Sequence, residues 1–392
     1  MAEEPSSWSG IGSQDHGAVD APDGIGPGPR RPADEPDTGV GRPVCPMAGR
    51  RRAGRSRHRA RWLLLAAGLL LVVVVVVGWL WVDGQVHPSG PRGAQVVVTV
   101  APGASTEHTL DVLSAKGVMG SPLAFRLWTI VHGSVAIDAG TYAFNRNDGF
   151  AAVWEIFNGG PNVFHLDVRP GLTVAEVVGQ LGLMPGQDGV AFERLATSGV
   201  LRSPYEPAGS KSLEGLLGTG VYEILPGETD RTLLGQMIAR FDAEAASAGL
   251  AAGAAALGYT PYQVVTVASI DEKEGVYGPN LGPVARVIYN RLARGMPLQM
   301  DSTVLYALGQ DGGTVTHADE ATPSPYNTYL NTGLTPTPIC FPSTASLAAA
   351  LHPPAGQWLY FQVVSENGTE AFADTFAQQL ANEKLAQERG LP

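Results

Sequence analysis

The chain has 392 residues, a formal net charge of −11 at pH 7 and a hydrophobic content of 44%. This length allows one to three domains with a sizeable core. The negative net charge argues against general nucleic-acid binding, although the charge is unevenly spread along the chain. The 49 glycines and 30 prolines indicate many turns or a disordered portion.

The first 49 residues are rich in Pro, Gly, Asp and Glu, a composition typical of disorder. They are followed by RRRAGRSRHRAR, which has seven arginines between Arg50 and Arg61. A nucleic-acid patch is one interpretation, but a topology signal fits better because the block adjoins a long apolar segment. We therefore predict that residues 1–61 form a disordered cytoplasmic tail that ends in an arginine-rich block.

The apolar segment is WLLLAAGLLLVVVVVVGWLWV, residues 62–82, and it contains no charge. As a helix it would span about 31 Å, the thickness of a hydrocarbon core. Trp62, Trp79 and Trp81 lie near its ends, where interfacial anchors are expected. A cleaved signal peptide would be shorter, and a buried core helix would not contain six successive valines without a polar face. We predict a single-pass protein of the cell membrane with a cytoplasmic N-terminus and everything after Asp83 outside.

Two stretches within residues 95–202 form a weak repeat, Val98–Met119 and Leu166–Met184. Each is typical of a strand, a Pro-Gly turn, an apolar helix and a glycine stop. Two interpretations fit this pattern equally well: a LysM-like substrate-binding region, and ordinary packing of strands on helices. Between the repeats, residues 135–144 suggest a strand and residues 150–160 a short amphipathic helix.

A helix is expected from Pro261, preceded by the cap Thr260, to Glu274, with Gly275 as its stop. It ends in two glutamates that each continue an apolar line, so spacing nominates Glu272 and Glu274 nearly equally. Burial and the helix C-terminus would raise either carboxyl pKa, as a general acid requires. Alternatively both are solvated in a frayed last turn. Asp271 and Lys273 are expected to face solvent.

A second amphipathic helix is predicted over residues 281–295, and a β-hairpin around Asn367–Gly368. The loops that follow the helix carry the hydroxyl, amide and aromatic groups that a saccharide groove needs. These groups belong to Gln299, Asp301, Ser302, Thr303, Tyr306, Tyr326, Asn327, Thr328 and Tyr329. The two cysteines, Cys45 and Cys340, have no metal-ligand spacing, and no phosphate loop or nucleophile triad is present, so we expect no disulfide, metal or cofactor.

Three separated blocks, ASIDEKE, YNRLARGMPLQMDSTVLYALG and PYNTYLNTGL, resemble the YceG-like family of membrane-anchored endolytic murein transglycosylases. The usual family pattern is ASI-x-EKE, then NRL-x-x-GM-x-LQ-[TS]-D-P-TV-x-Y-x-L-G, then Y-NTY-x-x-x-GLPP. The resemblance is strong from about residue 213 to 380 and weaker from 96 to 202. It implies an α+β fold, with a YceG-like catalytic domain over residues 203–392 after the LysM-like region.

The resemblance also implies cleavage of peptidoglycan strands between N-acetylmuramic acid and N-acetylglucosamine, which would terminate or trim nascent strands. It assigns the catalytic role to the first glutamate of EKE, Glu272. That carboxyl would protonate the glycosidic oxygen and then accept the proton of the muramic C6 hydroxyl, leaving a 1,6-anhydro end without a protein nucleophile. The implied substrate-positioning residues are Gln299, Asp301, Asn327, Thr328 and Tyr329. Asn290 and Arg291 are instead expected to brace the helix against the loops.

Several residues depart from the family pattern. Asp271 replaces an apolar residue, while Met300 and Ser302 stand where Thr and Pro are usual. Two other functions remain open: a non-catalytic peptidoglycan-binding scaffold, and a hydrolytic muramidase. The muramidase would need a second acid, for which Glu274, Asp301 and Asp319 are available. Besides glycan strands, cell-wall synthases and division proteins are the candidate partners.

Overall fold

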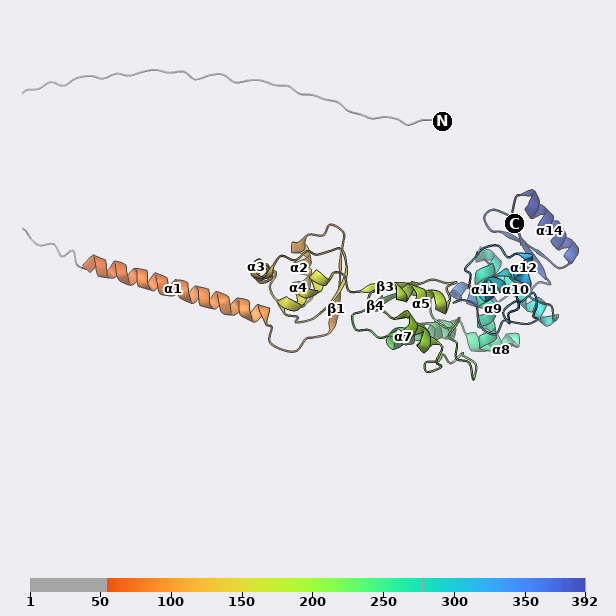
Figure 1. Cartoon of the computed structure of the whole chain (residues 1–392), viewed down its shortest axis with the longest axis horizontal. Coiled ribbons are helices and arrows are strands. Elements are labelled where there is room, and N and C mark those ends of the chain that lie inside the picture. Colours follow the sequence, from red (N-terminus) through yellow and green to blue (C-terminus); the bar gives the residue numbers. More distant parts are fainter. Residues whose placement is uncertain (1–54, 276–277, 392) are drawn as a thin grey trace, which may run out of the picture. The chain divides into compact units, whose positions relative to one another are not determined.

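The computed structural model describes residues 55–275 and 278–391, and it combines many helices with three short antiparallel strand pairs (Figure 1). The strand pairs are β1 (Gln95–Val100) with β2 (Gly140–Asn145), β3 (Phe164–Val168) with β4 (Gly220–Ile224), and β5 (Tyr360–Val363) with β6 (Glu370–Ala373). The helices are α1 (Arg55–Val86), α2 (Thr106–Ala115), α3 (Pro122–His132), α4 (Phe150–Gly159), α5 (Val174–Gly182), α6 (Gly189–Ala196), α7 (Asp230–Ser247), α8 (Leu250–Leu257), α9 (Pro261–Glu274), α10 (Leu281–Ala293), α11 (Asp301–Leu308), α12 (His317–Glu320), α13 (Thr344–Leu351) and α14 (Phe376–Glu388). The predicted mixture of helices and strands is confirmed.

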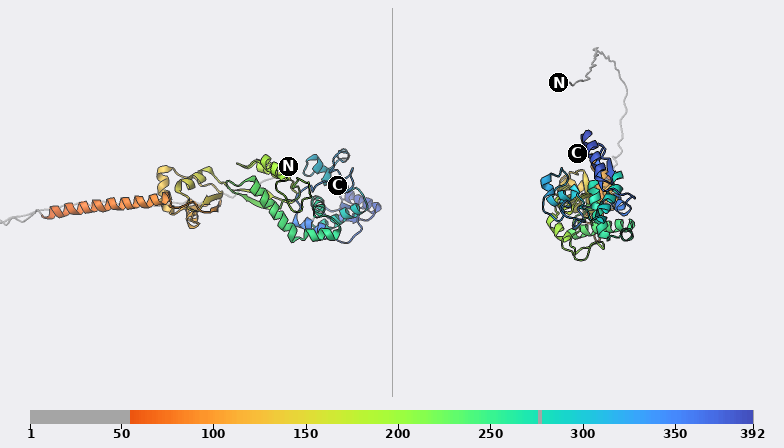
Figure 2. Two further views of the ribbon diagram at one scale, coloured as in Figure 1. Left: turned by 90° about the horizontal axis from the view of Figure 1, so that it is seen from below. Right: turned by 90° about the vertical axis from the view of Figure 1, so that its right-hand side faces the viewer.

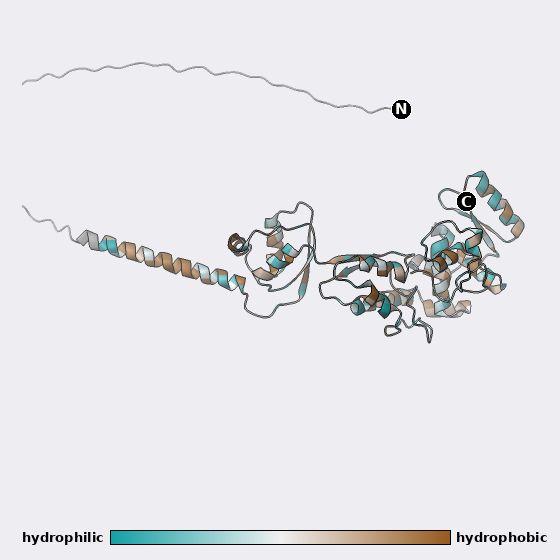
Figure 3. Cartoon of the chain, viewed as in Figure 1, coloured by the Kyte–Doolittle hydropathy of each residue, from teal (hydrophilic) through white to brown (hydrophobic). Residues whose placement is uncertain are grey.

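Helix α1 contains the whole predicted span, residues 62–82, and is long and apolar enough to cross a membrane. It is unbroken in the side view of Figure 2 and hydrophobic along its middle in Figure 3. Except for the partly buried Val82, the leucine and valine side chains of the span are exposed, as they would be in contact with lipid. Of the predicted disordered tail, residues 1–61, the part up to residue 54 lies outside the described residues. Residues 55–61 are helical and form the start of α1, so the prediction of disorder was wrong for them.

The first part after α1 has the order strand, helix, helix, strand. The β-branched run of β1 pairs in register with β2, from Gln95 opposite Asn145 to Val100 opposite Gly140. Ser121 caps α3, which has Pro122 at its first turn. A small core of its own joins Leu113, Phe125, Tyr142, Phe144 and others. The strand expected over residues 135–144 is shorter than predicted, and α4 matches the predicted helix.

The second repeat has the same order, β3, α5, α6 and β4 (Figure 1). Gly171, at φ 85°, makes the Pro-Gly turn, and Thr173 closes a capping box with Glu176 at the start of α5. The core of this unit is continuous with the large core around α9. The expected boundary at residues 202 and 203 therefore falls inside one core, while the two cores separate between Phe157 and Leu166.

Helix α9 begins and ends where the sequence predicts, with a Thr260–Gln263 capping box and Gly275 at its C-terminus. Helices α8, α10, α11 and α13 all contact it, so its residues from Val264 to Asp271 are buried on every side. The expectation that Asp271 is solvated was wrong, because its exposed fraction is 0%. Lys273, also expected to face solvent, is partly buried.

The C-terminal elements hold α10 in place. The β5–β6 hairpin turns at Asn367–Gly368, as predicted, and α14 lies beside it. Asn290 Nδ2 donates to the carbonyl oxygens of Gly356 and Trp358, and Arg291 Nε donates to Leu359 O at 2.6 Å. Both residues make the bracing contacts expected of them.

Candidate active site

A cavity of about 730 Å³ opens beside the C-terminal end of α9. Its lining combines carboxyl, hydroxyl and aromatic groups with a glycine-rich loop, which suits a ligand with many hydroxyls. The lining residues are Thr173, Ala175, Glu176, Glu214, Lys273, Glu274, Asp301, Ser302, Leu305, Tyr306, Gly309, Gln310, Asp311, Gly312, Gly313 and Ile339.

Glu274, the last residue of α9, presents its carboxyl group to this cavity. Its Oε1 accepts a hydrogen bond from the backbone N–H of Ser302, in the first turn of α11, at 3.1 Å. Burial raises the pKa of Glu274, and the contact with Ser302 opposes that shift. A raised pKa increases the protonated fraction of a carboxyl group at a given pH, which favours its action as a general acid.

Glu272 makes different contacts. Its Oε2 accepts a hydrogen bond from the backbone N–H of Ser343 at 2.8 Å and another from the Ser346 hydroxyl. These donors belong to the N-terminal turn of α13, where a carboxylate satisfies a free N–H and complements the helix dipole. Glu272 is absent from the cavity lining, so its contacts are those of a helix-capping group.

Glu214 is a second acid in the cavity and was not among the predicted site residues. It is buried, accepts from Val174 N at 3.1 Å, and accepts from the Tyr306 hydroxyl at 3.3 Å. Burial raises the pKa of Glu214 to about 7, and the hydrogen bonds from Val174 and Tyr306 offset part of that shift. An acid inside the apolar stretch SLEGLLG was the signal in the sequence.

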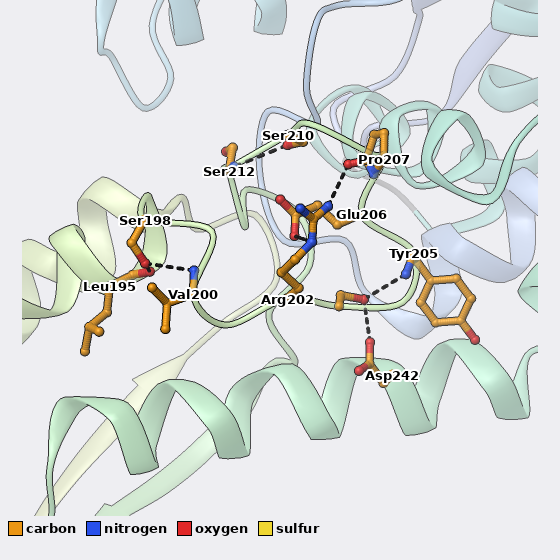
Figure 4. Close-up of polar contacts among 11 residues, drawn as sticks. Leu195, Ser198, Val200, Arg202, Tyr205, Glu206, Pro207, Ser210, Ser212 and Asp242 are labelled. Carbon is orange, nitrogen blue, oxygen red and sulfur yellow. Dashed lines mark hydrogen bonds and ion pairs between the residues drawn. The ribbon is translucent and has the colours of Figure 1, made fainter.

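The loop before Glu214 is fixed by its own polar contacts (Figure 4). Arg202 pairs with the buried Glu206 at 3.3 Å and donates to Pro207 O at 2.8 Å. Ser203 Oγ donates to Asp242 Oδ1 on α7 at 2.6 Å. Closer to the acid, the Ser212 hydroxyl accepts from Glu214 N at 3.2 Å, which ties the end of the loop to Glu214.

Asp301 and Tyr329, two predicted positioning residues, meet at the cavity edge. The Tyr329 hydroxyl donates to Asp301 Oδ1 at 2.5 Å, and Asp301 lines the cavity. Gln299 has a left-handed backbone with φ of 50°, and its N–H donates to Thr328 O at 3.1 Å. Its side chain is exposed and outside the lining.

Asn327 and Thr328 are buried and do not line the cavity. Asn327 Nδ2 donates to the carbonyl oxygens of Glu320 and Thr322, and its Oδ1 accepts from Tyr329 N. Thr328 Oγ1 accepts from Met300 N at 3.0 Å. These contacts brace the loop in which the two residues lie, and their role in substrate positioning stays a prediction.

Asp271 precedes Glu272 in α9 and is fully buried. Burial, then the charges of Glu272 and Glu370, raise the pKa of Asp271 to about 9. Burial raises the pKa of Glu370, on β6, to about 8. Asp271 is therefore protonated at neutral pH and adds no negative charge beside the two glutamates of the EKE motif.

Comparison with known proteins agrees with the resemblance of the three sequence blocks. The model of the YceG-like family matches residues 98–385. The chain belongs to the YceG-like family. It is 44% identical to an endolytic murein transglycosylase of Bacillus subtilis over 117 residues, which cover 30% of this chain and 32% of the relative. It is 32% identical to an endolytic murein transglycosylase of Streptococcus pneumoniae over 177 residues, 44% of this chain and 32% of the relative. The matched parts span about a third of each relative's length.

A solved structure of a yceG-like protein from Listeria monocytogenes has the same fold as this member of the YceG-like family. The TM-score is 0.52 at 24% sequence identity, and the match covers 73% of this chain and 98% of that chain. The curated match and the solved structure thus agree on the family fold. The chemistry of this chain has to be argued from its own cavity.

Proposed function

We propose that this protein is a membrane-anchored lytic transglycosylase that cuts peptidoglycan glycan strands between N-acetylmuramic acid and N-acetylglucosamine. The observation that carries the proposal is a carboxyl group of raised pKa, Glu274, at the wall of a 730 Å³ cavity rich in polar groups. The names of the matched relatives support the same reaction class. The apolar helix α1 supports attachment to the cell membrane, with the cavity on the cell-wall side.

The proposed acid is Glu274 in place of Glu272, which the sequence motif had nominated. Glu274 would protonate the glycosidic oxygen, and its carboxylate would then accept the proton of the muramic C6 hydroxyl as that oxygen attacks C1. The choice rests on position: Glu274 lines the cavity, whereas Glu272 is absent from the cavity lining and accepts two hydrogen bonds at the start of α13.

Asp301 and Tyr329 are proposed to position the sugar at the cavity edge, because their linked side chains lie there. The proposed role of Gln299, Asn327 and Thr328 is indirect: they hold the backbone of the loops that carry Asp301 and Tyr329. The strand–helix–helix–strand order of residues 95–145 supports a LysM-like glycan-binding role for that unit. Cosedimentation of the full chain with purified sacculi, before and after substitution of the exposed turn at residues 101–105, tests that role.

A hydrolytic muramidase is the second candidate, because Glu214 and Glu274 line one cavity and could act as a carboxyl pair. Product chemistry separates the candidates. Purified glycan strands are incubated in detergent with the full-length protein or with its Glu274→Gln or Glu272→Gln variant. The ends of the products are identified by mass spectrometry.

Anhydro-muramic ends from the unmodified protein and from Glu272→Gln, but none from Glu274→Gln, are the expected result. The opposite pattern of the two variants would return the catalytic role to Glu272. Reducing ends would establish a hydrolase. Binding of strands without cleavage by any of the three proteins would point to a scaffold.

A further inference from the structure

Helix α3 carries an apolar face that nothing else in the described part of the chain covers. Leu123, Leu127, Ile130 and Val131 have exposed fractions of 62%, 48%, 78% and 82%. Their spacing of four, three and one places them on one side of the helix. The opposite side, with Ala124 and Phe125, is buried in the small core. Figure 3 shows α3 as strongly hydrophobic.

The exposed face of α3 lies beside the last turns of α1, the proposed membrane-spanning helix. Val86, at the end of α1, packs against the small core that α3 helps to form. Leu127 and Val131 border a cavity of about 380 Å³ together with Trp79 and Val82 of α1. Trp79 and Val82 belong to the apolar segment, so the exposed face of α3 lies at the depth of the proposed membrane boundary.

The short connection between α1 and β1 also keeps α3 near the membrane boundary. Only residues 87–94 separate α1 from β1, and eight residues reach at most about 28 Å when fully extended. The unit that contains α3 is thus kept close to the end of α1. In contrast, the exposed apolar residues of the second repeat, Leu183, Val190 and Val200, lie in separate segments and form no comparable helical face.

We propose that α3 is an interfacial helix whose Leu123–Val131 face inserts between the lipid headgroups beside the transmembrane span. Aliphatic side chains on one face, with Trp128 at its edge, suit the boundary between headgroups and acyl chains. The proposal rests on the membrane anchoring proposed above. It gives the protein a second membrane contact, which fixes the orientation of the first unit at the bilayer.

Depth-dependent fluorescence quenching tests it on the full chain in vesicles of phosphatidylethanolamine and phosphatidylglycerol. Single cysteines replace Ile130, Val77 or Leu183 in a Cys45→Ser background, where the remaining Cys340 is buried. Each is labelled with an environment-sensitive fluorophore, and shallow nitroxide lipids are added. Leu183, 87% exposed and in the other unit, is the matched control, and Val77 in α1 reports anchoring.

The expected result is quenching at Val77 and Ile130 that exceeds that at Leu183 several-fold. Quenching at Val77 with Ile130 no more affected than Leu183 overturns the proposal and leaves the anchoring intact. No quenching at Val77 overturns the anchoring together with the proposal. A probe at Ile130 that is shielded from water but unquenched also overturns it, because the cover is then a protein surface.

An Ile130→Ser, Val131→Ser double variant separates this contact from catalysis. Both side chains are exposed and remote from the cavity, so cleavage of glycan strands in detergent should be unchanged. The quenching of a probe at Leu127 should fall several-fold in the same variant. Unchanged quenching at Leu127 would contradict the proposal.

Discussion

The backbone N–H of Ser302 donates a hydrogen bond to Glu274 Oε1 at 3.1 Å. The motif that this chain resembles usually has proline where Ser302 stands, and proline has no N–H to donate. The hydrogen bond stabilises the charged carboxylate, so it lowers the pKa of Glu274 against the opposing effect of burial. This departure from the family pattern thus acts directly on the proposed acid.

Ser302→Pro should therefore raise the pKa of Glu274. Because the acid must be protonated before cleavage, the activity of the variant should persist to higher pH than that of the unmodified protein. Ser302→Ala keeps the N–H and is the matched control. The test is the pH dependence of strand cleavage, and an equal displacement by both variants would show that the N–H is not responsible.

Glu214 should make folding stability depend on pH. Its folded pKa of about 7 lies above the ordinary carboxyl value, so its contribution is present at low pH and is lost as the pH rises through 7. Glu214→Gln should flatten this part of the stability curve, measured by thermal unfolding from about pH 4.5 to 8. A curve of unchanged slope would contradict the assignment.

Asp271 should have a larger effect over a wider range. Its pKa of about 9 in the folded protein means that the native state holds a proton that the unfolded chain releases above about pH 4. Stability should fall as the pH rises toward 9. Asp271→Val should remove this dependence and stabilise the protein by at least about 1 kcal/mol at pH 8. Denaturant unfolding at pH 5 and pH 8 measures both effects, and Asp271→Asn controls for side-chain size.

Ser346→Ala should separate the two glutamates of the EKE motif. It removes the hydroxyl donor to Glu272, and we expect a loss of about 1 kcal/mol in the free energy of unfolding. The pH profile of strand cleavage should not move, because Glu274 keeps its contacts. A displaced profile would indicate that Glu272 titrates in the reaction.

Asn327 and Gln299 should respond differently to alanine. Asn327→Ala removes a buried side chain and leaves the partly buried carbonyl groups of Glu320 and Thr322 without this donor, so the protein should lose about 1–3 kcal/mol of stability. Gln299→Ala removes an exposed side chain and should leave stability within about 0.5 kcal/mol. Chemical denaturation of both variants tests the contrast, and equal losses would refute the bracing role of Asn327.

Local signals in the sequence were sufficient for most elements. The capping residues and proline at Thr260–Pro261 located α9, and Asn367–Gly368 located the β5–β6 turn. The exposure of Asp271 was mispredicted, because helical spacing assumes one polar face and α9 has neighbours on all sides. Helical periodicity shows which residues share a face, but it does not show how many other helices pack against that helix.

The same holds for the candidate site, where local sequence signals named candidate residues and tertiary contacts determined their surroundings. Spacing nominated Glu272 and Glu274 nearly equally, and the family resemblance then favoured Glu272. The structure gives the two carboxyl groups different partners, Ser343 for Glu272 and Ser302 for Glu274, which are far away in the sequence. Glu214 was missed for the same reason: its role depends on Val174 and Tyr306, 40 and 92 residues away. Asn327 and Thr328 belong to a recognisable motif, but their burial follows from tertiary packing that the motif does not contain.

The cavity draws its walls from distant parts of the chain, from Thr173 through Glu214 and Glu274 to Ile339. A ribosome delivers these parts in order, so α1 and the first repeat emerge long before the last wall. Glu274 acquires its hydrogen-bond donor only once Ser302 has been made, and the cavity is complete only after Ile339. A nascent chain halted before Ile339 therefore carries its apolar helix without a complete cavity.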